Sequence, residues 1–482
     1  MGKNFLIPII LIISLTLVSC GLKKGAGSSS SGTTAATTSS NGSTSGGSGG
    51  GGGTLTVNAA ATTANPVNLM SSGAGATARI GHTLTKLSDG RVLIVGGCTI
   101  DADYTTAMSS VYIYNPDDGS FTATGSLGSA RCYHQAVYMT NVNKVLVSGG
   151  YLTSTAVTAT AEVYDVAAGT WSAAGSIIAG ARVWHTMTYI PSIAKVLVAG
   201  GSAAATSAQS NTELYDPVAN TWATTTGALD RRFQGHGAVL LNTGNVLIGG
   251  GTSQILTRPP PPTPGGDVNF SLFNPSTQTW SAAASSPTSH SSGEALLKAQ
   301  DGKVYIYSDC SGAFCSGATS AYDPVANTWA AKNTFATSEW QIGAAVTQGD
   351  IFFRIGGTDS SAVAQSDVLT YAKSTDTWAA ASFTFPSVTR ETRAITTHAG
   401  IFAFGGMDTA GAAHNTYILY KPYNSIQITA SGGTAPYTYA VTSGTGAIAP
   451  SSGVLYPGAP STITVTVTDS VSATGTVNIT VN

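Results

Sequence analysis

Charged side chains are scarce in this chain of 482 residues. Asp, Glu, Lys and Arg together make up 9% of the sequence, and the formal net charge is −2. In an ordinary soluble domain about a quarter of the residues are charged. The sequence therefore lacks the basic surface that nucleic-acid binding requires, and we expect no nucleic-acid partner. It also lacks the heptad pattern of a coiled coil.

The signatures of several enzyme classes are missing as well. The sequence contains no nucleophile elbow, no phosphate-binding glycine loop ahead of a helix and no HExxH zinc motif. Glycine, by contrast, is abundant at 57 residues. Together with Ser, Thr and Ala it favours turns and short strands over helices. The composition therefore predicts an all-β fold.

An apolar run lies at the N-terminus, in residues 1–20. It follows Lys3, covers residues 5–18 and ends at Leu17-Val18-Ser19-Cys20, so it is shorter than the roughly 20 residues that span a membrane. Its end resembles the lipobox of bacterial lipoproteins, which implies lipid attachment at Cys20. The alternative is an ordinary signal peptide with an incidental cysteine. Gly21, rather than Asp, comes next, which is similar to Gram-negative lipoproteins sent on to the outer membrane. We therefore expect a lipid-anchored protein of the cell envelope.

The next segment, residues 21–53, consists almost wholly of Gly, Ser, Thr and Ala and ends in five glycines. Such a composition cannot bury a core, so the segment is predicted to be a flexible tether.

From about residue 75 the chain repeats an apolar strand that ends in paired glycines. Six pairs occur, and Ser308-Asp309 in KVYIYSD stand where a further pair would be. Seven units of about fifty residues indicate a repeat architecture. The glycine pairs are Gly96-Gly97, Gly149-Gly150, Gly200-Gly201, Gly250-Gly251, Gly356-Gly357 and Gly405-Gly406.

A second marker keeps the same period: an aromatic residue is followed seven residues later by another aromatic residue, usually Trp. Turn-forming residues such as Asn115-Pro116 and Asp216-Pro217 lie between the two. This spacing predicts two strands joined by a tight turn. The pairs are Tyr114/Phe121, Tyr164/Trp171, Tyr215/Trp222, Phe273/Trp280, Tyr322/Trp329 and Tyr371/Trp378.

Paired glycines, then Tyr, then Trp resemble the kelch repeat over residues 75–424. The resemblance implies a seven-bladed β-propeller, for which we expect residues 54–424, each blade being a four-stranded sheet. Residues 54–58 are predicted to complete the last blade and so to remove an exposed edge. After Tyr423 strands alternate with period two, and residues 425–482 resemble a small bacterial Ig-like β-sandwich.

Variable loops follow the glycine pairs, and they lie on the same face of a propeller as the start of each first strand, where an Arg/His pair recurs. Varied loops on a rigid ring commonly bind ligands. One hypothesis is a ring of histidines that holds a metal or an anionic ligand; the other is that the pairs tie each blade to its neighbour, because repetition on a scaffold first indicates architecture. The candidates are Arg79, His82, Arg131, His134, Arg182, His185, Arg232 and His236.

Two tryptophans near this face, Trp184 and Trp340, lie outside the seven-residue pairs. They are candidates for stacking on a sugar ring, and packing beneath a loop is the equal alternative.

Four cysteines follow Cys20, an even number that suits disulfides in an oxidising compartment. Cys310 and Cys315 share one loop, while Cys98 and Cys132 lie on the same face, so two disulfides are predicted with other pairings open. An alternative is a Cys–Tyr thioether, as in copper radical oxidases of the galactose-oxidase kind, which also carry kelch propellers. That family needs two tyrosines and two histidines around one copper, and no such set recurs here, so we expect no metal and no cofactor.

These features predict a surface-anchored binding or adhesion lipoprotein. Its partners would be the membrane, through the lipid, and a protein or glycan bound by the loop face. The alternative is a carbohydrate-active enzyme on the same propeller, either a copper oxidase or a sugar isomerase. A third hypothesis is a structural role in an outer-membrane assembly.

Overall fold

The computed structural model is all-β, and its described residues contain strands and turns but no helix. Accordingly, no helix in the described part of the chain is long and apolar enough to cross a membrane. The described residues are 37–39, 55–61, 69–71, 75–99, 106–203, 208–227, 229, 235–251, 268–288, 296–307, 318–335, 339–348, 350–359, 361, 363–420, 426–444, 446–448, 453–457 and 461–481.

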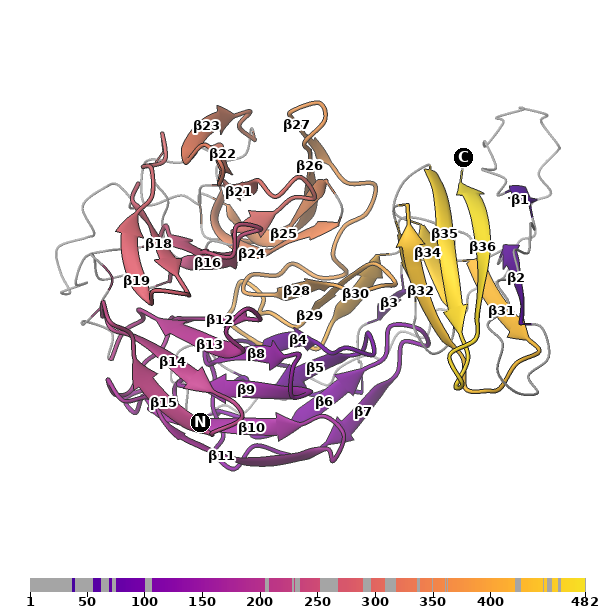
Figure 1. The fold of residues 1–482 in the computed structure, drawn as a ribbon. Helices are drawn as coiled ribbons and strands as arrows, with labels where there is room; N and C mark the ends of the chain where they lie inside the picture. The colour runs from indigo at the N-terminus through magenta and orange to yellow at the C-terminus, as the bar shows by residue number, and fades with distance from the viewer. Residues whose placement is uncertain are drawn as a thin grey trace, which may run out of the picture. The chain divides into compact units, whose positions relative to one another are not determined.

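Seven four-stranded antiparallel sheets follow one another along the chain and form the blades of a β-propeller (Figure 1). Blades 1 to 4 consist of β4 (Thr83–Lys86), β5 (Val92–Val95), β6 (Val111–Tyr114) and β7 (Phe121–Thr124); β8 (Gln135–Met139), β9 (Lys144–Ser148), β10 (Thr160–Asp165) and β11 (Thr170–Ser176); β12 (Thr186–Ile190), β13 (Lys195–Ala199), β14 (Thr212–Asp216) and β15 (Thr221–Thr224); and β16 (Gly237–Leu240), β17 (Val246–Gly249), β18 (Phe270–Asn274) and β19 (Thr279–Ala282).

Blades 5 to 7 complete the ring, and the last one takes its fourth strand from the N-terminal part of the chain. They consist of β20 (Leu297–Lys298), β21 (Val304–Tyr307), β22 (Thr319–Asp323) and β23 (Thr328–Lys332); β24 (Glu339–Gln348), β25 (Ile351–Asp359), β26 (Ala364–Ala372) and β27 (Thr377–Ala380); and β28 (Arg393–Thr396), β29 (Ile401–Phe404), β30 (Tyr417–Tyr420) and β3 (Leu69–Ser71). The predicted all-β, seven-bladed propeller is therefore confirmed.

The second strand of each blade is mainly apolar because both of its faces are buried between neighbouring blades, and β25 of blade 6 is the one that carries a buried charged residue, Arg354, in its centre among the described residues. In β9, Leu146 packs towards blade 3, whereas Val145 and Val147 pack towards blade 1. The described residues form seven such hydrophobic clusters, one at each junction of two blades, including that of blades 7 and 1. Burial of apolar surface at every junction is the main force that closes the ring.

The aromatic pairs lie at the hairpin of the third and fourth strands, as the sequence predicts. Tyr164 is directly opposite Trp171, and their ring centroids are 5.1 Å apart. The indole N–H of Trp171 donates to the carbonyl of Gly125 in blade 1 at 2.7 Å. The tryptophan therefore also links its blade to the preceding one, which a purely apolar residue would not do.

A separate two-sheet β-sandwich is built from the C-terminal strands and two N-terminal ones. One sheet has the order β1 (Thr37–Ser39), β36 (Thr474–Val481), β35 (Ser461–Thr468) and β32 (Thr438–Ser443); the other has the order β2 (Thr56–Ala61), β31 (Ile426–Ser431), β34 (Val454–Pro457) and β33 (Gly446–Ile448). Residues of both sheets share one hydrophobic core, which includes Leu55 next to β2.

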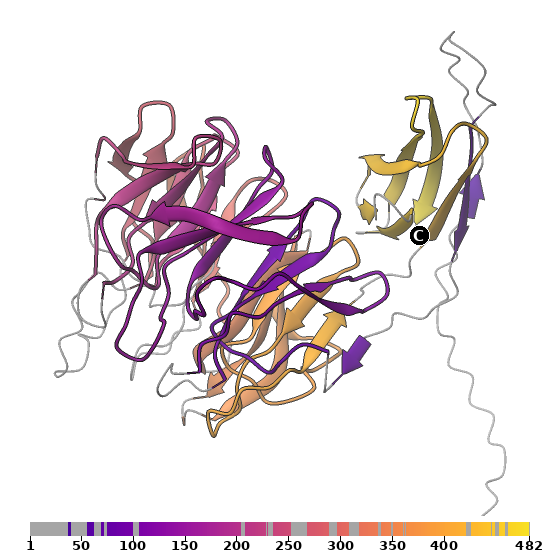
Figure 2. The same cartoon turned by 90° about the horizontal axis from the view of Figure 1, so that it is seen from below.

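The prediction that residues 54–58 complete the last blade is wrong. β2 pairs with β31 of the sandwich, with Ala61 opposite Ile426, whereas β3 pairs with β30 of blade 7 (Figures 1 and 2). An N-terminal strand does close the ring, but it is a later one. Because β2 precedes the propeller and β31 follows it, the propeller is an insertion within the sandwich.

Candidate functional site

In several blades the first strand is preceded by a turn on the loop face, here called the leading turn: residues 79–82, 131–134, 182–185 and 389–392 in blades 1, 2, 3 and 7, while in blade 4 the last two residues of this turn, Gly235 and His236, are described. Its second residue forms an antiparallel bridge with the residue after the glycine pair, as between Ile80 and Cys98. Its first residue accepts a hydrogen bond from the preceding blade, as when the Gly97 N–H donates to the Arg131 carbonyl at 3.0 Å. The Gly406 N–H donates in the same way to the Arg79 carbonyl at 3.1 Å, which joins blade 7 to blade 1.

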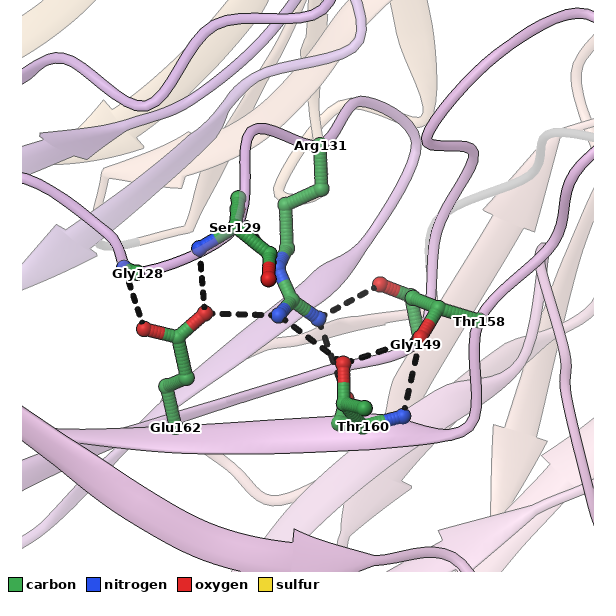
Figure 3. A network of polar contacts seen from close by, with 7 residues as sticks. All are labelled: Gly128, Ser129, Arg131, Gly149, Thr158, Thr160 and Glu162. Atoms are coloured by element: carbon green, nitrogen blue, oxygen red, sulfur yellow. Dashed lines mark hydrogen bonds and ion pairs between the residues drawn. The ribbon is translucent and has the colours of Figure 1, made fainter.

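The arginines of the leading turns are buried inside their own blades. The Arg131 guanidinium donates to the carbonyls of Gly149 and Thr160, each at 3.0 Å, and pairs with Glu162 at 2.7 Å (Figure 3). Glu162 also accepts hydrogen bonds from the backbone N–H groups of Gly128 and Ser129. The arginine therefore ties together the leading turn, the glycine pair and the third strand of one blade.

The buried arginine recurs in blades 1 and 3. Blade 3 repeats the ion pair with a glutamate, whereas blade 1 has an aromatic partner in its place. In blade 3 Arg182 pairs with Glu213 at 3.0 Å, and both side chains are fully buried. In blade 1 Arg79 lies over the ring of Tyr112, 5.0 Å from its centroid, and burial lowers the pKa of Arg79 to about 10. Tyr112 stands two residues before Tyr114, as Glu213 stands before Tyr215, so a cation–π contact replaces the ion pair.

Replacing Glu213 by alanine is expected to lower the free energy of unfolding by about 3–5 kcal/mol, because it leaves the Arg182 guanidinium buried without a counter-charge. Glu213 also accepts hydrogen bonds from the N–H groups of Ile178 and Ala179, which would lose their partner. Urea unfolding measures the loss.

Lys144→Ala is the control for this prediction, since the Lys144–Asp165 pair is exposed and 3.6 Å long. Its effect should stay below about 1 kcal/mol. Equal effects of Glu213→Ala and Lys144→Ala would contradict the role given to the buried pair.

The histidines of the leading turns are buried between blades. The Nε2 atom of His134 lies 3.1 Å from the Thr83 hydroxyl of blade 1, and that of His236 lies 3.0 Å from the Thr186 hydroxyl of blade 3. His185 reaches Ser148 of blade 2 at 3.1 Å in the same way. Burial lowers the pKa of His134 to about 3 and that of His236 to about 3, so these rings are neutral at neutral pH.

The first glycine of three pairs, Gly96, Gly149 and Gly405, makes room for the next blade's histidine. Gly96 has a φ of +56°, and a Cβ atom there would lie 2.6 Å from the Arg131 carbonyl oxygen and 2.9 Å from the His134 ring. No larger side chain fits so close to backbone. The glycine pair and the Arg/His pair are therefore two halves of one contact between blades.

The Arg and His candidates in the described residues therefore do not form a ligand-facing ring. Arg79, Arg131 and Arg182 have no exposed surface, and His82, His134, His185 and His236 are 1–6% exposed. Except for His82, whose ring nitrogens have no hydrogen-bond partner, their side chains make polar contacts between and within blades, which is the arrangement that the second of the two hypotheses describes. Arg232 lies outside the described residues.

Blade 6 departs from the repeat and shows a residue that the sequence analysis missed. Its leading turn carries no arginine in the described residues, but Arg354 on β25 is fully buried and donates to the Gly356 carbonyl at 3.0 Å. It also lies 3.7 Å from Asp367 on the third strand. The arginine within the apolar strand IFFRIGG was the signal that could have identified it.

The residue before the last one of the leading turn differs strongly among the blades. It has a left-handed backbone, with φ between 53° and 61°, in five blades. Glycine adopts this conformation freely, while other L-residues are disfavoured by about 1 kcal/mol or more. The residues are Gly81, Tyr133, Trp184, Gly235 and Glu391.

Two of these residues belong to a group of three rings, here called the aromatic arc: Tyr133, Tyr151 and Trp184. Tyr133 and Tyr151 meet edge to face at 6.4 Å between centroids, and Tyr151 and Trp184 do so at 5.8 Å. The two tyrosines are 8% and 4% exposed, whereas Trp184 is only half-buried. The Trp184 ring is thus the part of the arc that a ligand can reach.

Tyr133 connects the arc to blade 7. Its ring lies over Gly81, where an added Cβ would come within 2.9 Å, and its hydroxyl donates to the Glu391 carboxylate at 2.6 Å. A disulfide between Cys98 and Cys132, with Cα atoms 5.7 Å apart, fixes the neighbouring residue of the same turn. The sequence could not indicate this connection, because residues 133 and 391 meet only when the ring is closed.

The remaining site candidates lie outside what the structure describes. Cys20, Cys310 and Cys315 are not among the described residues, and Trp340 lies on β24, of whose side chains nothing is described.

No family model matches the chain, and no curated protein matches it. Among solved structures, a fungal alcohol oxidase of the AA5 family, in complex with copper, is 13% identical with a TM-score of 0.58; the match covers 86% of this chain and 98% of that one. A structure of YjhT is 16% identical with a TM-score of 0.46, over 62% of this chain and 96% of that one. At 13% identity the likeness to the oxidase supports the propeller fold, and it does not indicate an activity or a site.

The described residues do not fit a copper site of the radical-oxidase kind. Cys132 is held in a disulfide, and the Tyr133 hydroxyl is hydrogen-bonded to Glu391. The Nε2 atoms of His134, His185 and His236 are bonded to hydroxyl groups between blades. No step through copper follows from this arrangement.

Proposed function

We propose that this chain is a lipid-anchored binding protein of the bacterial cell envelope, located at the outer membrane. Its propeller would recognise a glycan or a protein through the aromatic arc on the loop face. The lipobox-like Leu17-Val18-Ser19-Cys20 and the Gly/Ser/Thr-rich residues 21–53 support the anchor and the tether.

The conformation of Trp184 is the observation that carries the proposal. The repeat accepts glycine at this turn position, as Gly81 and Gly235 show, yet blade 3 holds a half-exposed tryptophan there with φ of +53°. The fold sets the left-handed backbone at this position but does not require a residue other than glycine there, and such strained residues collect at functional sites. A tryptophan ring offers a flat apolar surface and an N–H donor, which suits a sugar ring or an interface side chain.

An enzyme on the same propeller is the weaker alternative. The cysteine, tyrosine and histidine side chains that a radical oxidase would need are engaged in structural contacts, as described above. Ligand binding requires only the accessible Trp184 ring and polar groups around it, and no set of catalytic residues, so the residues present fit binding better than catalysis.

Trp184→Gly is expected to weaken ligand binding about tenfold or more, as central aromatic contacts commonly contribute 2 kcal/mol or more. The free energy of unfolding should change by less than about 1 kcal/mol, because relief of the left-handed strain offsets the lost contact with Tyr151. A glycan array, followed by titration of each ligand found, measures the binding of the chain from residue 36 onwards.

Val218→Gly is the matched control, since Val218 is 79% exposed on a turn of the opposite face. Binding should be unchanged in this variant. Ligand binding that survives Trp184→Gly would contradict the proposed site, and silence across the array would leave a protein as the ligand to test.

A further inference from the structure

The junction of blades 7 and 1 breaks the pattern of the inter-blade histidines. His134 and His236 each meet a threonine that directly follows the preceding blade's leading turn, Thr83 or Thr186. The leading turn of blade 7 covers residues 389–392, so the corresponding position is Arg393, and His82 is the histidine of the following blade. The other hydroxyl position, Ser148 for His185, corresponds to Phe404 in blade 7.

His82 is consequently buried without a hydrogen-bond partner. It is 1% exposed, neither ring nitrogen has a partner, and its ring meets Phe404 edge to face at 5.4 Å between centroids. A neutral imidazole always carries one N–H donor, and burying that donor unpaired is unfavourable. The His82 ring N–H is thus a buried donor without an acceptor.

Arg393 supplies a second unpaired donor on the same side of the blade. It is directly opposite Phe404 in the strand register, and opposed residues of neighbouring strands point to the same face of a sheet. Arg393 is exposed and makes no hydrogen bond or ion pair with another described residue. Its charge acts on His82, and together with burial and Arg79 it lowers the pKa of that ring well below the usual value.

The surroundings of these two side chains are rich in donors. Arg79, His134 and His414 also act electrostatically on His82, and Arg390 in the blade 7 turn has a buried Nε without a partner. Of the nearby carboxylates, Glu391 already accepts from Tyr133, and Asp408 acts on His414. The local field therefore favours an anion.

We propose that the junction of blades 7 and 1 on the loop face binds an oxyanion, a carboxylate or a sulfate, between the Arg393 guanidinium and the His82 ring N–H. A planar guanidinium matches such a group with two parallel hydrogen bonds, and the imidazole supplies a third. The inference rests on the proposed binding function and adds to it that the ligand carries negative charge. The charge belongs either to a free small anion or to an acidic sugar.

Arg393→Thr tests the site because it restores the hydroxyl that blades 1 and 3 have at this position. His82 would gain the partner that His134 and His236 have, so the variant is expected to fold at least as stably as the natural chain. Titration calorimetry with sodium sulfate and with sodium acetate, against sodium chloride at equal ionic strength, should show saturable binding to the natural chain. The variant should bind at least about tenfold more weakly.

Two further variants separate charge from geometry. Arg393→Lys keeps the charge but loses the paired hydrogen bonds, so its affinity should be intermediate. Arg91→Thr removes an exposed arginine that is already paired with Asp89, so its affinity should equal that of the natural chain. Glucuronate that binds more tightly than acetate, with glucose silent, would identify a sugar as the source of the charge; equal affinities would indicate a free anion.

Absence of sulfate and acetate binding to the natural chain, or undiminished binding to Arg393→Thr, would overturn the proposal. Trp184→Gly should retain anion binding, which keeps the two proposals apart. If glycan binding depends on Trp184 while sulfate does not bind, the anion site falls and the binding function stands. If sulfate binds through Arg393 while no glycan or protein ligand binds through Trp184, the anion site stands and the proposed binding of a larger ligand falls.

Discussion

A fragment in which Ala61 is joined to Ile426 by an Asn-Gly turn is expected to fold as an independent sandwich, whereas residues 426–482 alone are expected to stay unfolded. The reason is the pairing of β2 with β31, in which Ala61 is directly opposite Ile426. Two strands in this register can be connected by a two-residue hairpin turn. The 364 residues between them, 62–425, are then dispensable for the sandwich.

The C-terminal segment alone lacks one strand of its second sheet. Leu55 belongs to the sandwich core, Val57 and Ala59 pack against it, and Gly475 lies against Leu55 and Val57. Without β2 the edge of β31 and the buried Ile426 and Ile428 would face water. So small a domain has little stability to spare.

Amide proton NMR spectra of the two fragments check this prediction. The joined fragment, residues 36–61 and 426–482, should give dispersed resonances and cooperative thermal unfolding, and the C-terminal segment alone should give neither. A control with Val57→Asp in the joined fragment should also fail to fold. A folded C-terminal segment would show that β2 is an accessory strand.

The repeat made most of the propeller predictable. The glycine pairs and the aromatic pairs are local signals, so the hairpin that sets Tyr215 opposite Trp222 follows from spacing alone. The pairing of the N-terminal strands could not be predicted in this way, because residues 56–61 and 69–71 are both short and both suited to the edge of a sheet. Which of them pairs with blade 7 depends on partners more than 300 residues away, and no local pattern encodes that choice.

The candidate site was harder to predict for a related reason. Arg131 and His134 are residue types that serve a ligand site and a buried network equally well, and their role depends on partners elsewhere in the same blade and in the neighbouring one. The carboxylate of Glu162 and the hydroxyl of Thr83 decide it, and they lie 31 and 51 residues away in the sequence. Trp184 was identified from its place outside the repeat pattern, but its left-handed backbone is visible only in the structure.

Lowering the pH from 7 to 5 is expected to reduce the free energy of unfolding by about 4 kcal/mol through His134 and His236 alone. Burial lowers the pKa of each ring from 6.5 to about 3 in the folded chain. Below pH 6.5 the unfolded chain therefore binds protons that the folded chain excludes, and stability falls as the pH falls. At pH 5 each histidine contributes about 2 kcal/mol, and the loss continues towards pH 3.

His82 and His185 act in the same direction, since burial also lowers their pKa values well below 6.5. Urea unfolding at pH 7, 6 and 5 measures the slope, and a His134→Gln/His236→Gln variant isolates its cause. Glutamine can still hydrogen-bond to Thr83 and Thr186 but cannot be protonated in this range, so the variant should lose about 4 kcal/mol less between pH 7 and 5. A natural chain that is equally stable at pH 7 and 5 would mean that these rings reach water without unfolding. The inter-blade contacts would then be too loose to hold the leading turns, and with them Trp184 and Arg393, in place.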